Sequence, residues 1–132
     1  MANLRLKEAK ALYDRKLYDG ACYLAGYVVE LALKARICKL LDVDYPDTGD
    51  LSKIFKTHNC DSLLVLSGLR KKFDDEESSN TVFKTNWSLA TKIKPEFRYQ
   101  RIGPNPKTET EEIIKALEDP NDGVFTWIKK RW

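Results

Sequence analysis

YDGACYLAGYVVELALKA, residues 18–35, is the stretch that decides the fold. Its apolar residues recur every three or four positions, which is the period of one helix face. The pattern predicts a helix over residues 20–41, with an apolar stripe formed by Leu24, Val28, Leu31, Ala35, Cys38 and Leu41. Further apolar residues widen this stripe around most of the helix, which is typical of a central, buried helix.

A polar stripe also runs along this predicted helix. Tyr23, Tyr27, Glu30 and Lys34 follow one another at helical spacings, so they share one face. Glu30 and Lys34 form an i,i+4 pair in the favourable orientation. Two interpretations stay open: an ordinary structural ion pair, or a functional surface on the most buried helix.

Helical periodicity dominates the rest of the chain, and no clear alternating strand pattern is visible. Further helices are expected over residues 3–17, 50–55, 61–73, 80–93, 108–117 and 124–132. The very short connection after the first of these favours antiparallel neighbours. We therefore predict an all-α fold, an up-and-down antiparallel bundle of four to five helices, in a single domain over residues 1–132.

Several residues are expected to define where helices begin and where the chain leaves them. The acidic residues 74–79 are expected to form an exposed turn, and residues 96–106 an extended loop between prolines. Residues 119–123, DPNDG, should break or kink the last helix. The expected helix starts are Asp19, Asp50, Asp61 and the capping box of Thr108 and Glu111.

The composition limits the class of protein. The chain has 132 residues, of which 42% are hydrophobic and 33% charged, and this balance excludes a disordered chain. The net charge of +3 permits contact with nucleic acid but does not by itself indicate it. The chain has three cysteines, no CxxC pair and one histidine, so we expect free thiols, no metal site and no cofactor.

The sequence favours a cytoplasmic location. Residues 1–5 are not followed by the apolar run of a signal peptide. The most apolar stretch, residues 21–41, carries too many charged residues for a bilayer span, so no membrane association is expected.

Two groups of residues have the chemistry for a site. His58, the sole imidazole, is the only catalytic candidate, as a general base, and its alternative role is a structural hydrogen bond. Arg98, Tyr99 and Arg101 cluster in the expected loop. Arginine forks bind phosphate and aromatic rings stack on bases. The alternative is that these arginines pair with acidic neighbours and that the tyrosine packs on the bundle.

Residues 18–35 resemble the second helix of a HEPN domain, a name that stands for higher eukaryotes and prokaryotes nucleotide-binding. Residues 55–58, FKTH, followed by the leucines at 63 and 64 and by SGL at 67–69, resemble the next segment of that family. Trp87 followed by Arg98 and Tyr99 resembles its later region. The resemblance implies a four-to-five-helix bundle that is usually dimeric. Many members are toxins partnered by a minimal nucleotidyltransferase, and many are RNases.

The RNases of this family carry an arginine followed a few residues later by a histidine. No histidine follows Arg98 or Arg101 in this chain, so the usual RNase motif is absent and the resemblance favours a non-catalytic branch. We therefore expect a nucleotide- or RNA-binding module, a homodimer, with a possible nucleotidyltransferase partner in a toxin–antitoxin or defence context. Its expected ligand-binding residues are Tyr27, Glu30, Lys34, Trp87, Arg98, Tyr99 and Arg101.

Two alternatives come from other classes of protein. The first is a divergent, metal-independent RNase in which His58 acts with Arg98 or Arg101. The second is a structural adaptor that dimerises through the polar stripe. These alternatives differ in whether Tyr23, Tyr27, Glu30 and Lys34 line an open groove or lie sealed against a neighbour.

Overall fold

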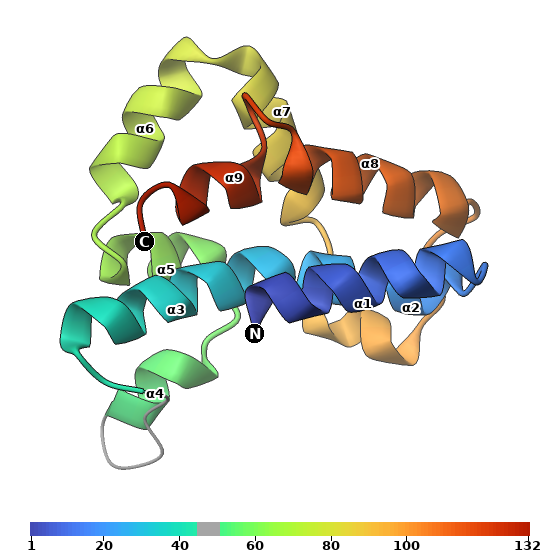
Figure 1. Cartoon of the computed structure of the whole chain (residues 1–132), viewed down its shortest axis with the longest axis horizontal. Coiled ribbons are helices and arrows are strands. Elements are labelled where there is room, and N and C mark those ends of the chain that lie inside the picture. The colour runs from blue at the N-terminus through green and yellow to red at the C-terminus, as the bar shows by residue number, and fades with distance from the viewer. Residues whose placement is uncertain (45–50) are drawn as a thin grey trace.

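Two antiparallel helices, α1 (Ala2–Asp14) and α2 (Tyr18–Gly26), pack side by side at the start of the chain, as the short connection predicts (Figure 1). The structure is a computed structural model that describes residues 1–44 and 51–132. Over these residues the fold is an all-α bundle without strands, so the predicted fold class is confirmed. The remaining elements are α3 (Val28–Leu41), α4 (Leu51–Lys56), α5 (Cys60–Leu66), α6 (Arg70–Ser79), α7 (Thr81–Ala90), the 3-10 helix η1 (Pro95–Tyr99), α8 (Pro106–Glu118) and α9 (Val124–Lys129).

The central helix is buried as predicted, but it is not continuous. Residues 20–41 are divided at Tyr27 into α2 and α3. A Cβ atom on the preceding Gly26 would lie 2.5 Å from Cβ of Ile93, so the backbone comes very close to the chain after α7 there. Glycine permits this approach and also has a low helix propensity, which explains the break. Both halves contribute fully buried residues to the core, among them Ala21, Cys22, Ala25, Val28, Val29, Ala32 and Leu33.

The C-terminal helices close the bundle over this centre. α8 packs against α2 and α7, and α9 packs against α3 and α8. The predicted break at residues 119–123 is confirmed, since α8 ends at Glu118 and α9 begins at Val124. After α9, the indole Nε1 of Trp132 donates to the backbone oxygen of Ala32 at 3.1 Å. The end of the chain is thereby held on α3.

Two expected segments take a different form. Residues 74–79 belong to α6 and are not a turn. Phe73 anchors this helix in the core, and Arg70 pairs with Asp74 one turn later at 3.0 Å. The expected helix over residues 61–73 is interrupted at Gly68, whose φ of +70° is a left-handed conformation that glycine adopts without strain. Residues 96–106 are not wholly extended, because η1 occupies the first of them.

Asparagines cap three helices, and at two of them, α5 and α8, aspartate and threonine were expected to do so. The side chains of Asn59, Asn80 and Asn105 accept hydrogen bonds from backbone N–H groups at the starts of α5, α7 and α8. Asp61 and Thr108 therefore lie inside their helices. Asp19 lies in the first turn of α2, and its carboxylate accepts the backbone N–H of Ile102 at 3.1 Å. The expected cap at Asp50 lies outside the described residues.

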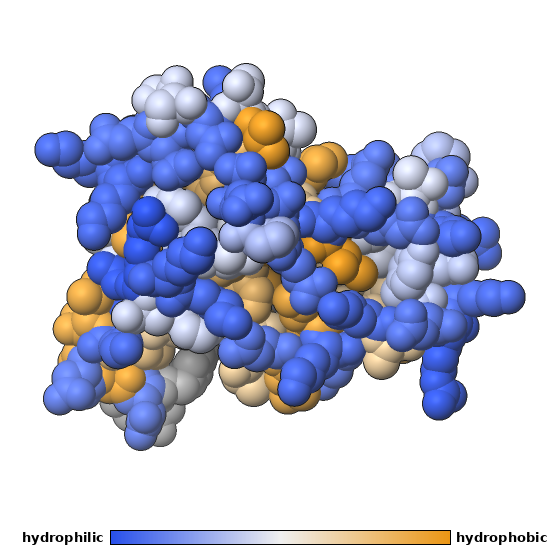
Figure 2. Space-filling model, turned by 45° about the horizontal axis from the view of Figure 1, so that its top comes forward, coloured by the Kyte–Doolittle hydropathy of each residue, from blue (hydrophilic) through white to orange (hydrophobic). Residues whose placement is uncertain are grey.

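Figure 2 shows one face of the molecule, which is mostly hydrophilic with hydrophobic side chains gathered in a few places. In the part of the chain that the structure describes, no helix combines the length and the apolar character needed to cross a membrane. The same residues contain no group of three or more His, Cys, Asp or Glu side chains placed to hold a metal ion.

Candidate functional site

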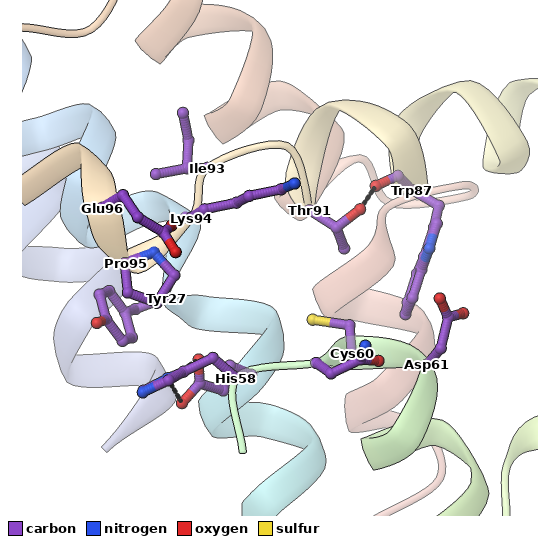
Figure 3. Close-up of a pocket in the computed structure, with 13 residues that line it drawn as sticks. Tyr27, His58, Cys60, Asp61, Trp87, Thr91, Ile93, Lys94, Pro95 and Glu96 are labelled. Carbon is purple, nitrogen blue, oxygen red and sulfur yellow. Dashed lines mark hydrogen bonds and ion pairs between the residues drawn. The ribbon is translucent and has the colours of Figure 1, made fainter. Parts of the chain in front are cut away.

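A pocket of about 410 Å³ lies where the joint between α2 and α3 faces the end of α7 (Figure 3). Four segments that are distant in sequence form its walls: the joint itself, residues 58–61 before and in α5, the C-terminal half of α7, and residues 93–96. Of the residues expected at a site, Tyr27, Glu30, His58 and Trp87 line it. The fold therefore brings together half of the expected site.

Two aromatic side chains stand on facing walls of the pocket (Figure 3). Trp87 comes from α7 and is half-buried against Phe73, with ring centroids 4.5 Å apart. Tyr27 lies at the α2–α3 joint, where its hydroxyl accepts a hydrogen bond from the hydroxyl of Tyr23 at 3.0 Å. Burial raises the pKa of Tyr27 to about 12, so its phenol is neutral at physiological pH.

Glu30 holds two cationic or polar partners at the base of the pocket. Its carboxylate accepts from Lys34 Nζ at 2.6 Å, and His58 Nδ1 lies 3.0 Å from both carboxylate oxygens. Glu30 is only 7% exposed, whereas the side chain of His58 is 45% exposed. A carboxylate beside Nδ1 favours the tautomer with a proton on that nitrogen, which leaves Nε2 as an acceptor.

The predicted polar stripe is divided by the fold. Tyr23 and Tyr27 border a shallow hollow of about 280 Å³, whose lining also includes Leu24, Leu31 and Met1. Glu30 and Lys34, with the Lys34 side chain 11% exposed, are nearly sealed and pair with each other. The tyrosines are therefore placed to meet a ligand or partner, and Lys34 is placed to balance the charge of Glu30.

Cys60 and Asp61 line the pocket at the start of α5. Burial raises the pKa of the Cys60 thiol to about 12, so it is not a thiolate nucleophile at neutral pH. Asp61 is exposed and pairs with Arg70 at 3.1 Å. Neither residue was expected at a site, because only tertiary packing brings this helix start opposite Trp87.

Lys94 is the cation that the sequence pattern did not reveal. Figure 3 shows its side chain reaching from the Pro95 side of the pocket toward Thr91. Lys94 is exposed and lines the pocket together with Pro95 and Glu96. Lys94 directly precedes Pro95, which ends a helical stretch, so the sequence does indicate a cation at the start of a loop. No local pattern indicates which cavity this lysine faces.

The expected cluster of Arg98, Tyr99 and Arg101 continues from the same segment outside the pocket lining. Tyr99 is 81% exposed, and the guanidinium of Arg98 lies over its ring at 5.3 Å. The charge of Arg98 also acts on the phenol of Tyr27, where it opposes the rise of the pKa. Arg101 is exposed, and the backbone N–H of the next residue, Ile102, donates to the carboxylate of Asp19, which fixes this part of the chain. The arginines therefore lie on a fixed surface segment outside the pocket lining.

Comparison with known proteins gives one finding. The model of the family described as the HEPN domain matches residues 1–128 of the chain. No curated protein and no solved structure matches the chain significantly.

Proposed function

This chain belongs to the HEPN domain family, and from that premise we propose that it binds a nucleotide or a short RNA segment in the Tyr27–Trp87 pocket. The observation that carries the proposal is the pair of aromatic rings on facing walls of the pocket, with the Lys94 side chain in the same lining (Figure 3). Aromatic rings stack on any base, and a lysine is a point charge for phosphate. A volume of about 410 Å³ is within the range of small-molecule sites.

Arg98, Tyr99 and Arg101 extend this surface beyond the pocket. An exposed tyrosine with a guanidinium over its ring offers a second stacking platform, and both arginines are exposed cations. We propose that they contact the phosphates or the next base of a bound strand. Glu30 and Lys34 support the pocket from below through His58 rather than by touching the ligand.

The module that we propose is non-catalytic. Its only histidine precedes both arginines of the η1 region, whereas the family's RNases have the histidine after the arginine. His58 is also engaged by the buried carboxylate of Glu30. We assign His58 to the support of the pocket wall beside Tyr27, whose ring meets the imidazole edge-on with centroids 6.3 Å apart.

Calorimetric titration with ATP, GTP and short RNA tests the binding proposal. Lys94→Gln removes the charge and keeps much of the side chain, and we expect it to weaken binding by about 1–3 kcal/mol, as for a lost charge-assisted hydrogen bond. Arg98→Ala should weaken binding by a similar amount. Lys107→Gln, at an exposed position in the first turn of α8, is the matched control. An absence of heat with all three ligands contradicts the proposal.

A metal-independent RNase is the second candidate, because Glu30 and His58 form a carboxylate–imidazole pair at an open pocket. In that reaction Nε2 would take the proton of a 2′-hydroxyl, the 2′-oxygen would attack phosphorus, and the bond from phosphorus to the 5′-oxygen would break as that oxygen takes a proton from water. Formation of 2′,3′-cyclic phosphate ends by the wild-type protein, lost in His58→Ala, would establish this candidate over the binding module.

We further propose a cytoplasmic homodimer that partners a minimal nucleotidyltransferase in a toxin–antitoxin or defence context. The family resemblance supports the partner and the context. Three free cysteines support the compartment, and the half-open hollow beside Tyr23 supports the dimer. Co-expression with a neighbouring nucleotidyltransferase gene, followed by co-purification, tests the partner. If the dimer forms but no nucleotide, RNA or nucleotidyltransferase binds, the structural adaptor replaces the binding module.

A further inference from the structure

A second and larger hollow lies on another part of the molecule, between α1 and α9. Its volume is about 850 Å³, twice that of the Tyr27–Trp87 pocket, and the two share no lining residue. α1 and α9 each pack against α3 and α8, so the hollow is a groove between two helices that lie on common neighbours. We call it the α1–α9 groove.

The rims of the groove are basic. Its lining contains four lysines, Lys7, Lys10, Lys129 and Lys130, and only two carboxylates, Asp14 and Glu118. Lys10 pairs with Glu118 at 3.0 Å. Among the described residues, the other three lysines have no carboxylate within ion-pair distance. A groove with this excess of unpaired cations attracts an anionic partner.

The floor of the groove is apolar. Leu6 and Phe125 are almost buried there, and the ammonium of Lys129 lies 5.2 Å from the centre of the Phe125 ring. Ala11 adds a small exposed apolar side chain on α1. The lysine stems and the apolar side chains together form a surface on which a partner gains binding free energy in two ways: burial of apolar area and neutralisation of charge.

The length of the groove along α1 suits a helix of about three turns. The α1 residues that line it, from Asn3 to Asp14, recur at spacings of three and four and form one stripe. At 1.5 Å per residue this stripe is about 16 Å long, or three helical turns. A helix seated here would rest on the same layer as α1 and α9 and would continue the packing of the bundle.

From these observations we propose that the α1–α9 groove docks an acidic amphipathic helix of a partner protein. The apolar face of that helix covers Ala11 and the lysine stems that lie over Leu6 and Phe125, and its carboxylates meet Lys7, Lys129 and Lys130, as in other helix-in-groove complexes. The phosphates of a nucleic-acid strand would neutralise the lysines but would not bury the apolar floor between them. This site goes beyond the nucleotide-binding proposal and does not depend on it.

A designed peptide tests the proposal on the full chain. The probe is a fluorescent synthetic peptide of about 18 residues, five turns, with leucines on one stripe and glutamates elsewhere. Its controls are a scrambled peptide of equal composition and single-stranded oligouridylate. We expect the amphipathic peptide to bind at least about tenfold more tightly than the scrambled one, with an affinity that falls as salt rises.

Variants locate the binding. Replacing Lys7, Lys129 and Lys130 by glutamate should weaken peptide binding about tenfold or more, and replacement by glutamine should weaken it less. The matched control reverses three other exposed lysines, Lys71, Lys72 and Lys107, and should bind like the wild type. Lys94→Gln, which alters only the nucleotide pocket, should also leave peptide binding unchanged. Far-UV circular dichroism confirms that each variant is folded.

Three results would overturn the proposal. The first is no binding of the amphipathic peptide at millimolar concentration. The second is equal binding of the amphipathic and scrambled peptides, which would indicate attraction by charge alone. The third is oligouridylate binding that is lost in the Lys7, Lys129 and Lys130 variants and competes with the peptide, which would assign the groove to nucleic acid.

Discussion

Glu30 is the residue on which the largest number of polar contacts in the candidate site depend. It is 7% exposed and holds Lys34 at 2.6 Å and His58 at 3.0 Å. Loss of its charge would leave the nearly buried ammonium of Lys34 without an anion, which is costly in a protein interior. We predict that Glu30→Gln lowers the free energy of unfolding by about 2–4 kcal/mol, measured by urea denaturation.

The matched control for Glu30 is Glu112→Gln. Glu112 is exposed on α8, so the same chemical change there should alter the free energy of unfolding by less than about 0.5 kcal/mol. Equal effects of the two substitutions would show that Glu30 contributes no more than a surface carboxylate.

The Cys60 thiol gives the folded state a dependence on alkaline pH. Burial raises its pKa from 9.0 to about 12. Above about pH 9 the unfolded chain therefore loses this proton while the folded chain keeps it, so stability is complete below pH 9 and falls toward pH 12. Cys22, whose pKa burial raises to about 11, and Tyr27 add to the same trend.

We predict that the free energy of unfolding falls between about pH 8.5 and pH 10.5, and that the fall is smaller in Cys60→Ala. Urea denaturation at both pH values gives the free energy of unfolding of each protein. The change between the two pH values is then calculated separately for each variant. Cys38→Ala is the control, because burial raises the pKa of Cys38 less than that of Cys60, and this variant should retain most of the fall. A wild-type stability that is constant over this range contradicts the prediction.

Sequence periodicity predicted part of the residue-scale arrangement. The i,i+4 spacing of Glu30 and Lys34 indicated their ion pair because that contact lies within one helix. The contact of Glu30 with His58 joins α3 to the segment before α5, and the place of Lys94 depends on the turn after α7. Such contacts follow from tertiary packing, so no local pattern indicated them.

At the scale of elements, Gly26 fixes how closely the α2–α3 joint approaches the chain after α7. A Cβ atom there would lie 2.5 Å from Cβ and 2.9 Å from Cγ2 of Ile93, and both residues line the Tyr27–Trp87 pocket. We predict that Gly26→Ala costs about 1–3 kcal/mol of stability through overpacking and weakens nucleotide or RNA binding. Thermal unfolding and calorimetric titration measure the two effects.

Gly20→Ala is the control for that substitution. The nearest atom to a Cβ at Gly20 is Cδ1 of Leu12 at 3.4 Å, which is a tolerable contact in α2. Since alanine favours a helix more than glycine does, this variant should be neutral or up to about 1 kcal/mol more stable. A Gly26→Ala protein as stable as Gly20→Ala would show that Ile93 moves away freely.

The same comparison explains which elements were predictable. The apolar stripe of residues 20–41 indicated a buried helix correctly, because burial depends on the local period. The break at Tyr27 had one local signal, the low helix propensity of Gly26, but the approach of Ile93 comes from another part of the chain and was not predictable. At helix starts, Asn59, Asn80 and Asn105 have the same capping chemistry as aspartate or threonine, and sequence alone did not rank these neighbouring candidates.

For the whole molecule, we predict a dimer that buries the hollow bordered by Tyr23, Leu24 and Leu31. Light scattering after size exclusion should give twice the chain mass of 15.3 kDa. Leu24→Gln should shift the mass toward the monomer, because it places a polar group in the apolar contact. Val65→Gln, at an exposed position on α5, is the control, and a monomer at every wild-type concentration contradicts the prediction.

The all-α class of the whole molecule was predictable, because helical periodicity dominates the chain, and the short connection between α1 and α2 indicated their antiparallel packing. The pocket was only half predictable. Tyr27, Glu30, His58 and Trp87 converge on it, but they come from four different elements or connections, and the arginines that sequence chemistry favoured lie beside it.

Tyr27 borders both the Tyr27–Trp87 pocket and the hollow beside Tyr23. The ring of Tyr27 is thus a wall of both cavities. A ligand or partner that reorients this ring in one cavity therefore changes the shape of the other. Thermodynamic reciprocity then requires that filling either cavity alter the affinity of the other by the same factor. If a second subunit occupies the hollow, dimerisation and nucleotide binding are coupled through Tyr27. The nucleotide concentration at half-saturation would then depend on protein concentration, and replacing Tyr27 would remove this dependence.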